Sequence, residues 1–462
     1  MVDILSIEAV EALRLIETEE SYFFDVKSRD VSPAKLSKTL SAFANASGGE
    51  VLIGVEEFEG ADGPERSWLG FSDQEDANPI FQMMETIDPL SSTFQSSFIR
   101  CDKFEGYILQ IICFKSRDII KNTSSSVYIR RNASNLPVNG EALERLKYEK
   151  GIISFEDEFC DASIKDVANS ECIIEFLLDV VPSGEPEIWL EKQRVVRGGR
   201  VTVAGVLLYS DGPQDILPKR SAVKILRYQT KEGAERDFLA FDPITIEGPI
   251  YDLIYDAVDK VKEIIDSIEK LGPKGLEPVS YPQDALHEIL TNAVLHRDYS
   301  IASDVQIRIF DNRLEIESPG RLPGHVTLEN IAKTQFARNP KLVRLINKFK
   351  NPPNKDVGEG INTAFEAMEK LRLKKPLFQE TDSSLLVTLK HESLASPETM
   401  VMEYLVGNEE ITNQIARDLT GIKSENSMKQ VFYRLREAGQ LEQTPKIKGK
   451  KPSWRRPTND AP

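Results

Sequence analysis

The stretch "SAFANASGGEVLIGVEE", residues 41–57, places the end of a helix directly before a strand. Upstream, "SPAKLSKTL" offers Ser32 as a helix cap and Pro33 as the first helical residue, and this helix is expected to end in "SGG". "EVLIGVEE" is a compact run of β-formers. An acidic helix at the chain start and strands around "SYFFDVKS", "GYILQIICF" and "SSVYIRR" complete a predicted α+β domain, residues 1–140.

Three further regions follow this domain. Residues 141–272 are expected to connect it to a second α/β unit and to begin that unit, with buried strands in "RVTVAGVLLYS" and "SAVKILRYQ" and a long amphipathic helix in "IYDLIYDAVDKVKEIIDSIEKL". Residues 273–393 alternate helix, strand and glycine-rich loop, and close with the strand "SSLLVTLKHE". Residues 394–445 give three short helices with the spacing of a winged helix, and 446–462 form a basic tail.

Length and composition narrow the function classes. A chain of 462 residues suits several domains, so we predict a multidomain α+β protein. No apolar run approaches the roughly 20 residues that span a bilayer, and the acidic N-terminus is unlike a secretory signal, so a cytoplasmic protein without a membrane partner is expected. The four cysteines include no C-x-x-C pair, which indicates neither a zinc site nor a disulfide framework. Because the net charge is −16, any nucleic-acid site must be local.

A polar stripe marks a candidate binding helix in "HEILTNAVLHRDYS", residues 287–300. Glu288, Asn292 and His296 recur at intervals of four, which places them along one side of a helix. Alone, such a stripe is more often a solvated face. Two glycine turns follow, "SPGRLPGHV" and "VGEGINTAFEAME", and such turns let backbone N–H groups approach phosphate oxygens. The glycines of these turns are Gly320, Gly324, Gly358 and Gly360. An Asn or Glu oxygen could hold Mg²⁺ against the phosphates, so the combination predicts a nucleotide site.

The order of these motifs resembles the GHKL (Bergerat-fold) ATP-binding family, in its divergent branch with "NAVxHRDY", "SPGxLP", "RNP" and "GxGI". The resemblance spans about residues 280–390 and implies an α/β sandwich that binds ATP with Mg²⁺. It implies that Asn292 is the magnesium ligand, that Glu288 is the base of a weak ATPase, and that Gly358 and Gly360 form the phosphate loop. The implied pocket wall consists of His296, Arg297 and Asp298.

Two features of this region leave alternatives open. The family's adenine-reading Asp is missing from "ESPGRLPG", although Glu317 is nearby, so altered base preference or a relic site without ATP are alternatives. The segment "RNPKLVRLINK" could bring Arg338 or Lys341 to a terminal phosphate, or could be a plain basic helix face. The chain has no Walker A loop.

Acidic residues gather near the first predicted strand. In "EESYFFDVKSRD", alternation places Asp25 and Lys27 on one strand face and Phe24 and Val26 on the other. Clustered carboxylates with a lysine suit a metal-dependent phosphodiesterase, because acids hold Mg²⁺ or Mn²⁺ and the lysine steadies developing charge. On spacing alone, an ion pair at a sheet edge is the stronger alternative.

"EESYFFDVK", "KTLSAFANASGGEVLIGVEE" and "VYIRRNASN" are similar to the Schlafen/AlbA-like domain over about residues 15–135. This resemblance implies binding of DNA or RNA, and some members cleave RNA with a carboxylate triad. Such domains also recur in antiviral defence. The implied catalytic set is Glu20, Asp25, Glu56 or Glu57, and Lys27, with Asp25 and Glu56 as metal ligands. Here Asp25 stands where the family usually has Glu, and Glu stands where it often has Asp. Arg130 and Arg131 are candidate phosphate contacts, or part of a solvated turn.

The C-terminal region supplies a further candidate nucleic-acid surface. Its third predicted helix, "NSMKQVFYRLREAG", carries Lys429, Arg434 and Arg436, although winged helices also bind proteins. The basic tail adds Trp454 as a candidate stacking group. The cations of this tail are Lys446, Lys448, Lys450, Lys451, Arg455 and Arg456.

The combination of these domains resembles RecG-like proteins and transcriptional regulators, although helicase motor motifs are missing. We weigh two hypotheses: a metal-dependent nuclease controlled by ATP and acting in antiviral defence, and a non-catalytic DNA-binding regulator whose assembly responds to ATP. GHKL domains often pair, and the helix expected at 250–271 could support a dimer. A homo-oligomer, at least a dimer, is therefore expected.

Overall fold

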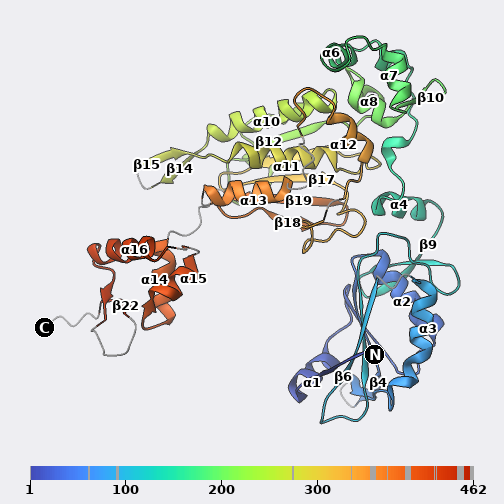
Figure 1. The fold of residues 1–462 in the computed structure, drawn as a ribbon, viewed down its shortest axis with the longest axis vertical. Coiled ribbons are helices and arrows are strands. Elements are labelled where there is room, and N and C mark those ends of the chain that lie inside the picture. The colour runs from blue at the N-terminus through green and yellow to red at the C-terminus, as the bar shows by residue number, and fades with distance from the viewer. Residues whose placement is uncertain are drawn as a thin grey trace. The chain divides into compact units, whose positions relative to one another are not determined.

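The structure is a computed structural model that describes residues 2–60, 63–89, 93–272, 275–334, 336–353, 360–371, 373–390, 397–420, 422, 424–444 and 452–457. The chain divides into two compact units. The first consists of Met1–Ala367 and Pro376–Leu389, and the second of Met368–Lys375 and Lys390–Pro462. The chain is a multidomain α+β protein with several sheets, two of which mix parallel and antiparallel pairs (Figure 1).

A five-stranded sheet organises the N-terminal part of the first unit. Its strands, in spatial order, are β1 (Asp3–Ser6), β6 (Phe94–Arg100), β7 (Ile108–Cys113), β3 (Gly49–Ile53) and β2 (Phe24–Lys27). The β1–β6 and β2–β3 pairs are parallel, and the other two pairs are antiparallel. A strand therefore precedes helix α1 (Ala9–Glu17), where the sequence predicted an opening helix.

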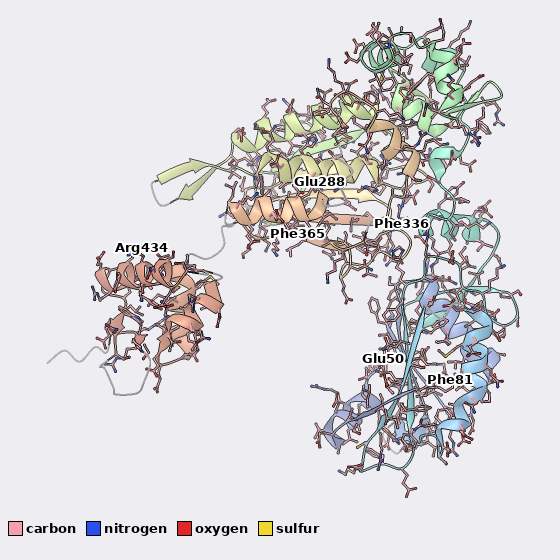
Figure 2. All side chains as sticks on the ribbon, in the orientation of Figure 1. Glu50, Phe81, Glu288, Phe336, Phe365 and Arg434 are labelled. Carbon is pink, nitrogen blue, oxygen red and sulfur yellow. The ribbon has the colours of Figure 1, made fainter. Side chains whose placement is uncertain are left out.

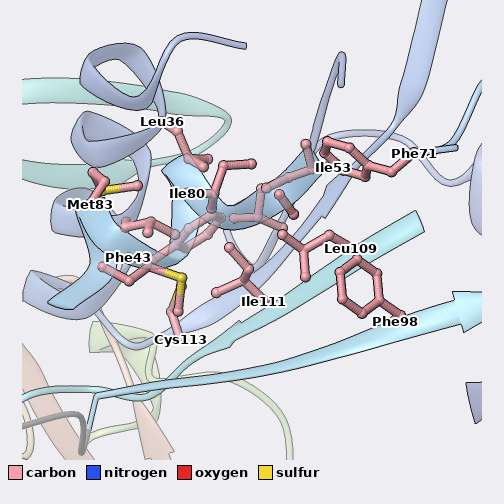
Figure 3. Packing of buried hydrophobic residues seen from close by; sticks show 14 residues of the cluster. Leu36, Phe43, Ile53, Phe71, Ile80, Met83, Phe98, Leu109, Ile111 and Cys113 are labelled. Carbon is pink, nitrogen blue, oxygen red and sulfur yellow. The ribbon is translucent and has the colours of Figure 1, made fainter. Parts of the chain in front are cut away.

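Helices α2 (Pro33–Asn45) and α3 (Asn78–Ile87) pack on this sheet, as Figure 3 shows. Ser32 accepts a hydrogen bond from the Lys35 N–H, which confirms the predicted cap. The cluster between helices and strands includes Leu36, Phe43, Ile80, Phe98 and Ile111. Phe24 and Val26 belong to a second cluster with Ile16 of α1, as the alternation of the strand predicted.

The segment "SAFANASGG" fastens a hairpin onto α2. The Asn45 side chain donates to the carbonyls of Ile120 and Tyr128 over 2.8 and 2.9 Å, and accepts the Ile120 N–H. Gly48 has a φ of +86°, and a Cβ there would lie 2.6 Å from the Cys113 carbonyl oxygen. The Asn45 hydrogen bonds hold strand β8 (Val127–Arg131), which pairs with β9 (Ser134–Val138), and Gly48 packs against the end of β7. The expected single strand in "EVLIGVEE" is split by Gly54 into β3 and β4 (Val55–Gly60), and β4 pairs with β5 (Gly63–Trp68).

A helical lobe follows, after α4 (Gly140–Lys150). Its elements are α5 (Lys165–Ala168), α6 (Glu171–Val180), α7 (Pro186–Lys192), β10 (Val196–Arg197), β11 (Arg200–Val201), α8 (Val203–Tyr209) and α9 (Pro213–Ile216). The strand predicted in "RVTVAGVLLYS" is wrong beyond Val201, because this run forms α8. Thr202 caps α8 by accepting the Gly205 N–H, and all seven residues of α8 are buried. A short apolar run does not distinguish a buried strand from a buried helix.

The second large sheet has six strands in the order β13-β12-β16-β17-β19-β18. Their bounds are β12 (Val223–Arg227), β13 (Ile244–Ile246), β16 (Val305–Ile309), β17 (Arg313–Pro319), β18 (Leu377–Glu380) and β19 (Ser384–Lys390). Helices α10 (Ile250–Asp266) and α11 (Gln283–Leu295) pack against each other and this sheet. A small hairpin, β14 (Glu269–Gly272) with β15 (Gly275–Pro278), lies between them in sequence, and α12 (Pro340–Ile346) and α13 (Gly360–Lys370) follow β17.

Helix α10 confirms the predicted amphipathic helix, and its apolar side is buried inside the chain. The buried side chains include Leu253, Ile254, Val258, Val261 and Ile265. The apolar side of α10 is therefore not available for contact with a second copy of the chain. The homo-oligomer stays a prediction, and α10 does not support it.

The described residues of the second unit form three helices and a small antiparallel sheet. The helices are α14 (Pro397–Gly407), α15 (Asn413–Thr420) and α16 (Glu425–Glu437), and the strands are β20 (Ile411–Thr412), β22 (Ser453–Arg455) and β21 (Glu442–Gln443). Trp454 is buried and stacks on Phe432 at 5.2 Å between ring centroids, so it is a core residue and not an exposed stacking group. No helix within the described residues is long and apolar enough to cross a membrane.

Candidate nucleotide and nucleic-acid sites

The polar stripe of α11 is formed by two helical residues and the residue that caps the helix. Asn292 Nδ2 donates to Glu288 Oε1 over 2.8 Å, and both side chains are half-buried (Figure 2 labels Glu288). His296 lies one residue beyond the helix, and its backbone N–H donates to the Asn292 carbonyl over 3.0 Å. Burial raises the pKa of the Glu288 carboxyl, partly opposed by the hydrogen bond from Asn292. A raised pKa suits a proton acceptor that works near neutral pH.

The turn "SPGRLPG" packs directly against the segment that follows α11. The Asp298 N–H donates to the Pro319 carbonyl over 2.7 Å, and a Cβ on Gly320 would lie 2.6 Å from the Asp298 Cβ and still closer to the Arg338 guanidinium. The Gly320 N–H donates to the Ser383 carbonyl over 2.7 Å. Gly320 is therefore placed for close packing, and its N–H is already used.

The other predicted phosphate ligands are spread over this region. Arg338 is 4% exposed, pairs with Asp298 at 3.4 Å and donates to the Arg321 carbonyl, so in this arrangement it braces the turn. Lys341 pairs with Asp157. Gly324 packs under the ring of Phe336. Gly360 is the first residue of α13, and Gly358 lies outside the described residues.

A magnesium ion would find few protein oxygens here. Among the described residues, no group of three or more His, Cys, Asp and Glu side chains could hold a metal ion. Mg²⁺ commonly takes one or two protein oxygens and completes its shell with substrate phosphates and water. The Asn292 amide oxygen fits that sparse pattern, because it is the Asn292 amide nitrogen that bonds to Glu288.

The N-terminal acidic residues are only partly brought together. Lys27 Nζ pairs with Asp25 and lies 3.5 Å from Glu20 Oε1. Glu56 accepts a hydrogen bond from Ser28 Oγ, next to Lys27 in the chain. Glu57 instead pairs with Arg66 at 2.7 Å.

Asp25 is the buried member of this group, and each of its two carboxylate oxygens bonds to a cationic side chain. It is 1% exposed, with Oδ1 on Lys27 and Oδ2 at 2.8 Å from Arg130 Nη1. Arg130 is equally buried and also donates to the carbonyls of Ser21 and Phe24. The expectation of a phosphate contact at Arg130 is therefore corrected: its burial and bonds make it a structural partner of Asp25. Because Lys27 and Arg130 already bond to both carboxylate oxygens of Asp25, this residue does not fit the role of a metal ligand. Arg131 is exposed, and its phosphate contact stays a prediction.

A polar junction joins the turn of residues 318–324 to the N-terminal region. Arg321 Nη2 donates to Ser47 Oγ over 2.9 Å, and Nη1 lies 3.4 Å from the Tyr22 hydroxyl. Lys115 Nζ donates to the carbonyls of Leu322 and Val326 over 2.6 and 3.1 Å. These contacts link residues 207 to 299 positions apart, and sequence reasoning missed them because spacing gives no sign of such distant pairs.

A second set of contacts in this junction surrounds Phe336 (Figure 2). The Arg117 guanidinium lies 5.6 Å from the centroid of the Phe336 ring. A Cβ on Gly151, which ends α4, would lie 2.7 Å from the same ring. Phe336 thus packs against Gly151 at the end of α4 and against Arg117 of the N-terminal region.

The predicted cations of the second unit lie on α16. Lys429 pairs with Glu425 at 2.7 Å, Arg434 pairs with Glu398 at 2.6 Å, and the Arg436 guanidinium lies over the Tyr433 ring. These are exposed pairs, which a phosphate could replace at little cost. Lys450 and Lys451 lie outside the described residues.

Comparison with known families agrees with these two regions. Residues 20–139 match the family model "Schlafen, AlbA_2", and residues 302–389 match a model described as "Putative ATP-dependent DNA helicase recG C-terminal". The chain carries a Schlafen AlbA_2 domain and a RecG-like C-terminal domain. The AlbA_2 match includes Glu20, Asp25 and Ser47, whereas the RecG-like match begins after the stripe of α11.

Two solved structures are also similar to this chain. The DIP2311 protein from Corynebacterium diphtheriae is 17% identical, with 97% of this chain and 96% of that chain covered and a TM-score of 0.41. The N-terminal domain of a RecG-related protein from Nitrosomonas europaea is 16% identical, with 27% of this chain and 86% of that chain covered and a TM-score of 0.20. Scores this low do not establish a common fold. A comparison with curated proteins gives no match.

Proposed function

We propose that the protein is a nucleic-acid-binding regulator whose state depends on ATP bound by the GHKL-like region around α11 and the RecG-like domain. The AlbA_2 domain and the second unit, which we interpret as a winged helix, are the proposed nucleic-acid surfaces. The observation that carries this proposal is the hydrogen bond from Arg321, within the turn packed on the end of α11, to Ser47 of the AlbA_2 signature.

The residues of the proposed site have separate tasks. Asn292 would hold the metal of an ATP–Mg²⁺ complex through its amide oxygen, while Glu288 orients the Asn292 amide through their 2.8 Å hydrogen bond. Mg²⁺, when bound with the nucleotide, neutralises phosphate charge. The half-buried Glu288 carboxyl, whose pKa is raised by burial, would accept a proton from water. The RecG-like description supports ATP and DNA as ligands.

The coupling route follows the contacts of the turn. Asp298 and Gly320 are packed so closely that a Cβ on Gly320 would not fit. A nucleotide that moves residues 296–298 would therefore also move Gly320. Arg321 then carries the displacement to Ser47 and Tyr22. Because a ligand shifts an equilibrium only by its differential affinity for two states, the proposal requires ATP to favour one arrangement of this junction.

Titration calorimetry tests the nucleotide site. Wild type and Asn292→Ala are titrated with ATP and Mg²⁺, with Asn351→Ala as a control that removes an amide on an exposed loop. The proposal expects loss of binding only in Asn292→Ala, and equal affinity in wild type and Asn292→Ala contradicts it.

A nuclease is the second candidate, because Glu20, Asp25 and Lys27 do lie together. The pairing of Asp25 with Arg130 favours a structural role for this carboxylate, so Asp25→Ala is a poor test of catalysis. Glu20 is 30% exposed in its side chain and is the better probe. Metal-dependent cleavage of labelled RNA or DNA that is lost in Glu20→Gln would favour the nuclease, and binding without cleavage favours the regulator.

A further inference from the structure

The hairpin of β10 and β11 concentrates positive charge that no proposed task uses. The nine residues 192–200, "KQRVVRGGR", contain Lys192, Arg194, Arg197 and Arg200 and no acid, in a chain of net charge −16. All four side chains are exposed. Within the described part of the chain, none of the four forms an ion pair, and the nearby Asp157 carboxylate is taken by Lys341.

Two arginines stand directly opposite each other in this hairpin. The register pairs Arg197 with Arg200, and both guanidinium groups lie over the single ring of Phe159, at 4.7 and 4.1 Å from its centroid. Like charges directly across a strand pair destabilise a sheet, and here the two guanidinium groups share one aromatic ring, which attracts each of them without separating their charges. An anion bound between the two groups would relieve it.

The base of the hairpin is buried and held by hydrogen bonds, and its tip has no close neighbours. Val195, Val196 and Val201 are at most 1% exposed, and Thr202 donates to the Val195 carbonyl through both its backbone N–H and its hydroxyl. Gly198 and Gly199, with φ of +58° and +76°, form the tip, and a Cβ on either would meet nothing within 4 Å. Figure 1 shows this hairpin projecting from the helices of the lobe.

We propose that the Arg197–Arg200 hairpin binds duplex DNA, with its glycine tip at a groove and its arginines on the phosphates. A two-stranded β-ribbon fits the major groove of B-form DNA. The arginine guanidinium is well suited to phosphate because it can donate two parallel hydrogen bonds to it. The deep and narrow major groove of duplex RNA does not admit a ribbon, so DNA is the expected partner. Arg194 and Lys192 would extend the contact along the backbone.

The test measures how salt weakens binding of the full chain to a labelled DNA duplex. Arg197→Gln/Arg200→Gln is compared with wild type and with Lys231→Gln/Arg236→Gln, which removes two charges that are also exposed, from the segment between β12 and β13. Each phosphate contact contributes about 0.9 to the slope of log K against log salt. The hairpin variant should lower that slope by about 2, and the control variant should not change it.

Three results would overturn the proposal. They are an unchanged slope in the hairpin variant, a loss confined to duplex RNA, or retained DNA affinity with loss of binding to poly-glutamate, which would assign the surface to an acidic protein. If the variant does not fold, photo-crosslinking of wild type to bromodeoxyuridine-substituted DNA gives an independent answer. Crosslinks mapping to residues 192–200 support the proposal, and crosslinks confined to other segments contradict it. Because Asn292→Ala leaves this surface intact, failure of the nucleotide site and failure of the hairpin are distinguishable.

Discussion

Arg321 Nη2 lies 2.9 Å from Ser47 Oγ, although 274 residues separate the two in sequence. Arg321 belongs to the turn that packs against the end of α11, and Ser47 belongs to the AlbA_2 signature "SAFANASGG". The Arg321 guanidinium therefore joins the proposed nucleotide region to the proposed nucleic-acid domain, beside the contacts of Lys115 with the same turn.

Replacing Arg321 should uncouple the two regions. In Arg321→Ala, ATP affinity should stay within about twofold of wild type, because Arg321 is not a proposed nucleotide ligand, while the effect of ATP on nucleic-acid binding should be lost. Arg313→Ala is the matched control, since Arg313 pairs with Glu315 within the second sheet. Fluorescence anisotropy with and without ATP measures the effect, and an ATP response that persists in Arg321→Ala would refute this route.

Removing the charge of Asp25 should destabilise the AlbA_2 domain. Asp25→Asn leaves the buried Arg130 without its counter-ion, and breaking a buried ion pair from one side costs about 3–5 kcal/mol. Glu20→Gln affects a partly exposed contact and should cost less than about 1 kcal/mol. Urea unfolding compares the two variants. Equal, small losses would show that the Asp25–Arg130 pair is not structural.

Gly320 should not tolerate a side chain. Its φ of +101° and its contact with Asp298 leave no space for a methyl group, so Gly320→Ala should lower stability by about 2–4 kcal/mol. Gly140→Ala is the control, because Gly140 has a φ of +53° but open space around its Cβ position, and the backbone alone costs about 1–2 kcal/mol. Thermal unfolding that gives the same loss for both variants would contradict the packing argument.

Lys150 should make stability depend on pH in the alkaline range. It is 2% exposed, and burial lowers its pKa from 10.5 to about 7. Between these values the unfolded chain binds a proton that the folded chain does not, so stability rises with pH by up to about 1.4 kcal/mol per unit. This contribution is complete above pH 10.5 and is lost as pH falls towards 7.

Lys150→Met isolates this effect from other titrating groups. The unfolding free energy of wild type minus that of Lys150→Met should increase between pH 7 and 10. A difference that stays constant over this range would mean that Lys150 keeps its proton in the fold.

Local patterns predicted most of the elements, because they depend on neighbouring residues. The Ser32 cap, the alternation of Phe24 and Val26, and the apolar spacing of α10 are all read within a few turns of chain. The same rules mistook α8 for a strand, since a fully buried run has no periodic polar side to indicate its structure.

Contacts between residues far apart in the sequence determine the features that local patterns could not predict. The sequence placed Arg130 after a strand, as an exposed phosphate ligand would be, yet it lies within β8 and is buried on Asp25, 105 residues away. Arg321 occupies the variable position of "SPGxLP", so no motif singled it out. The triad predicted around Asp25 remains incomplete for the same reason, because neighbouring cations use both of its oxygens.

The most direct test of the central claim measures nucleic-acid binding by the full chain in the presence and absence of ATP and Mg²⁺, for wild type, Asn292→Ala and Arg321→Ala. We expect ATP to change the wild-type affinity by at least about fivefold, the low end of typical coupling between sites, and to change neither variant. An affinity that is the same with and without ATP in wild type, measured where calorimetry shows the nucleotide bound, would contradict the account.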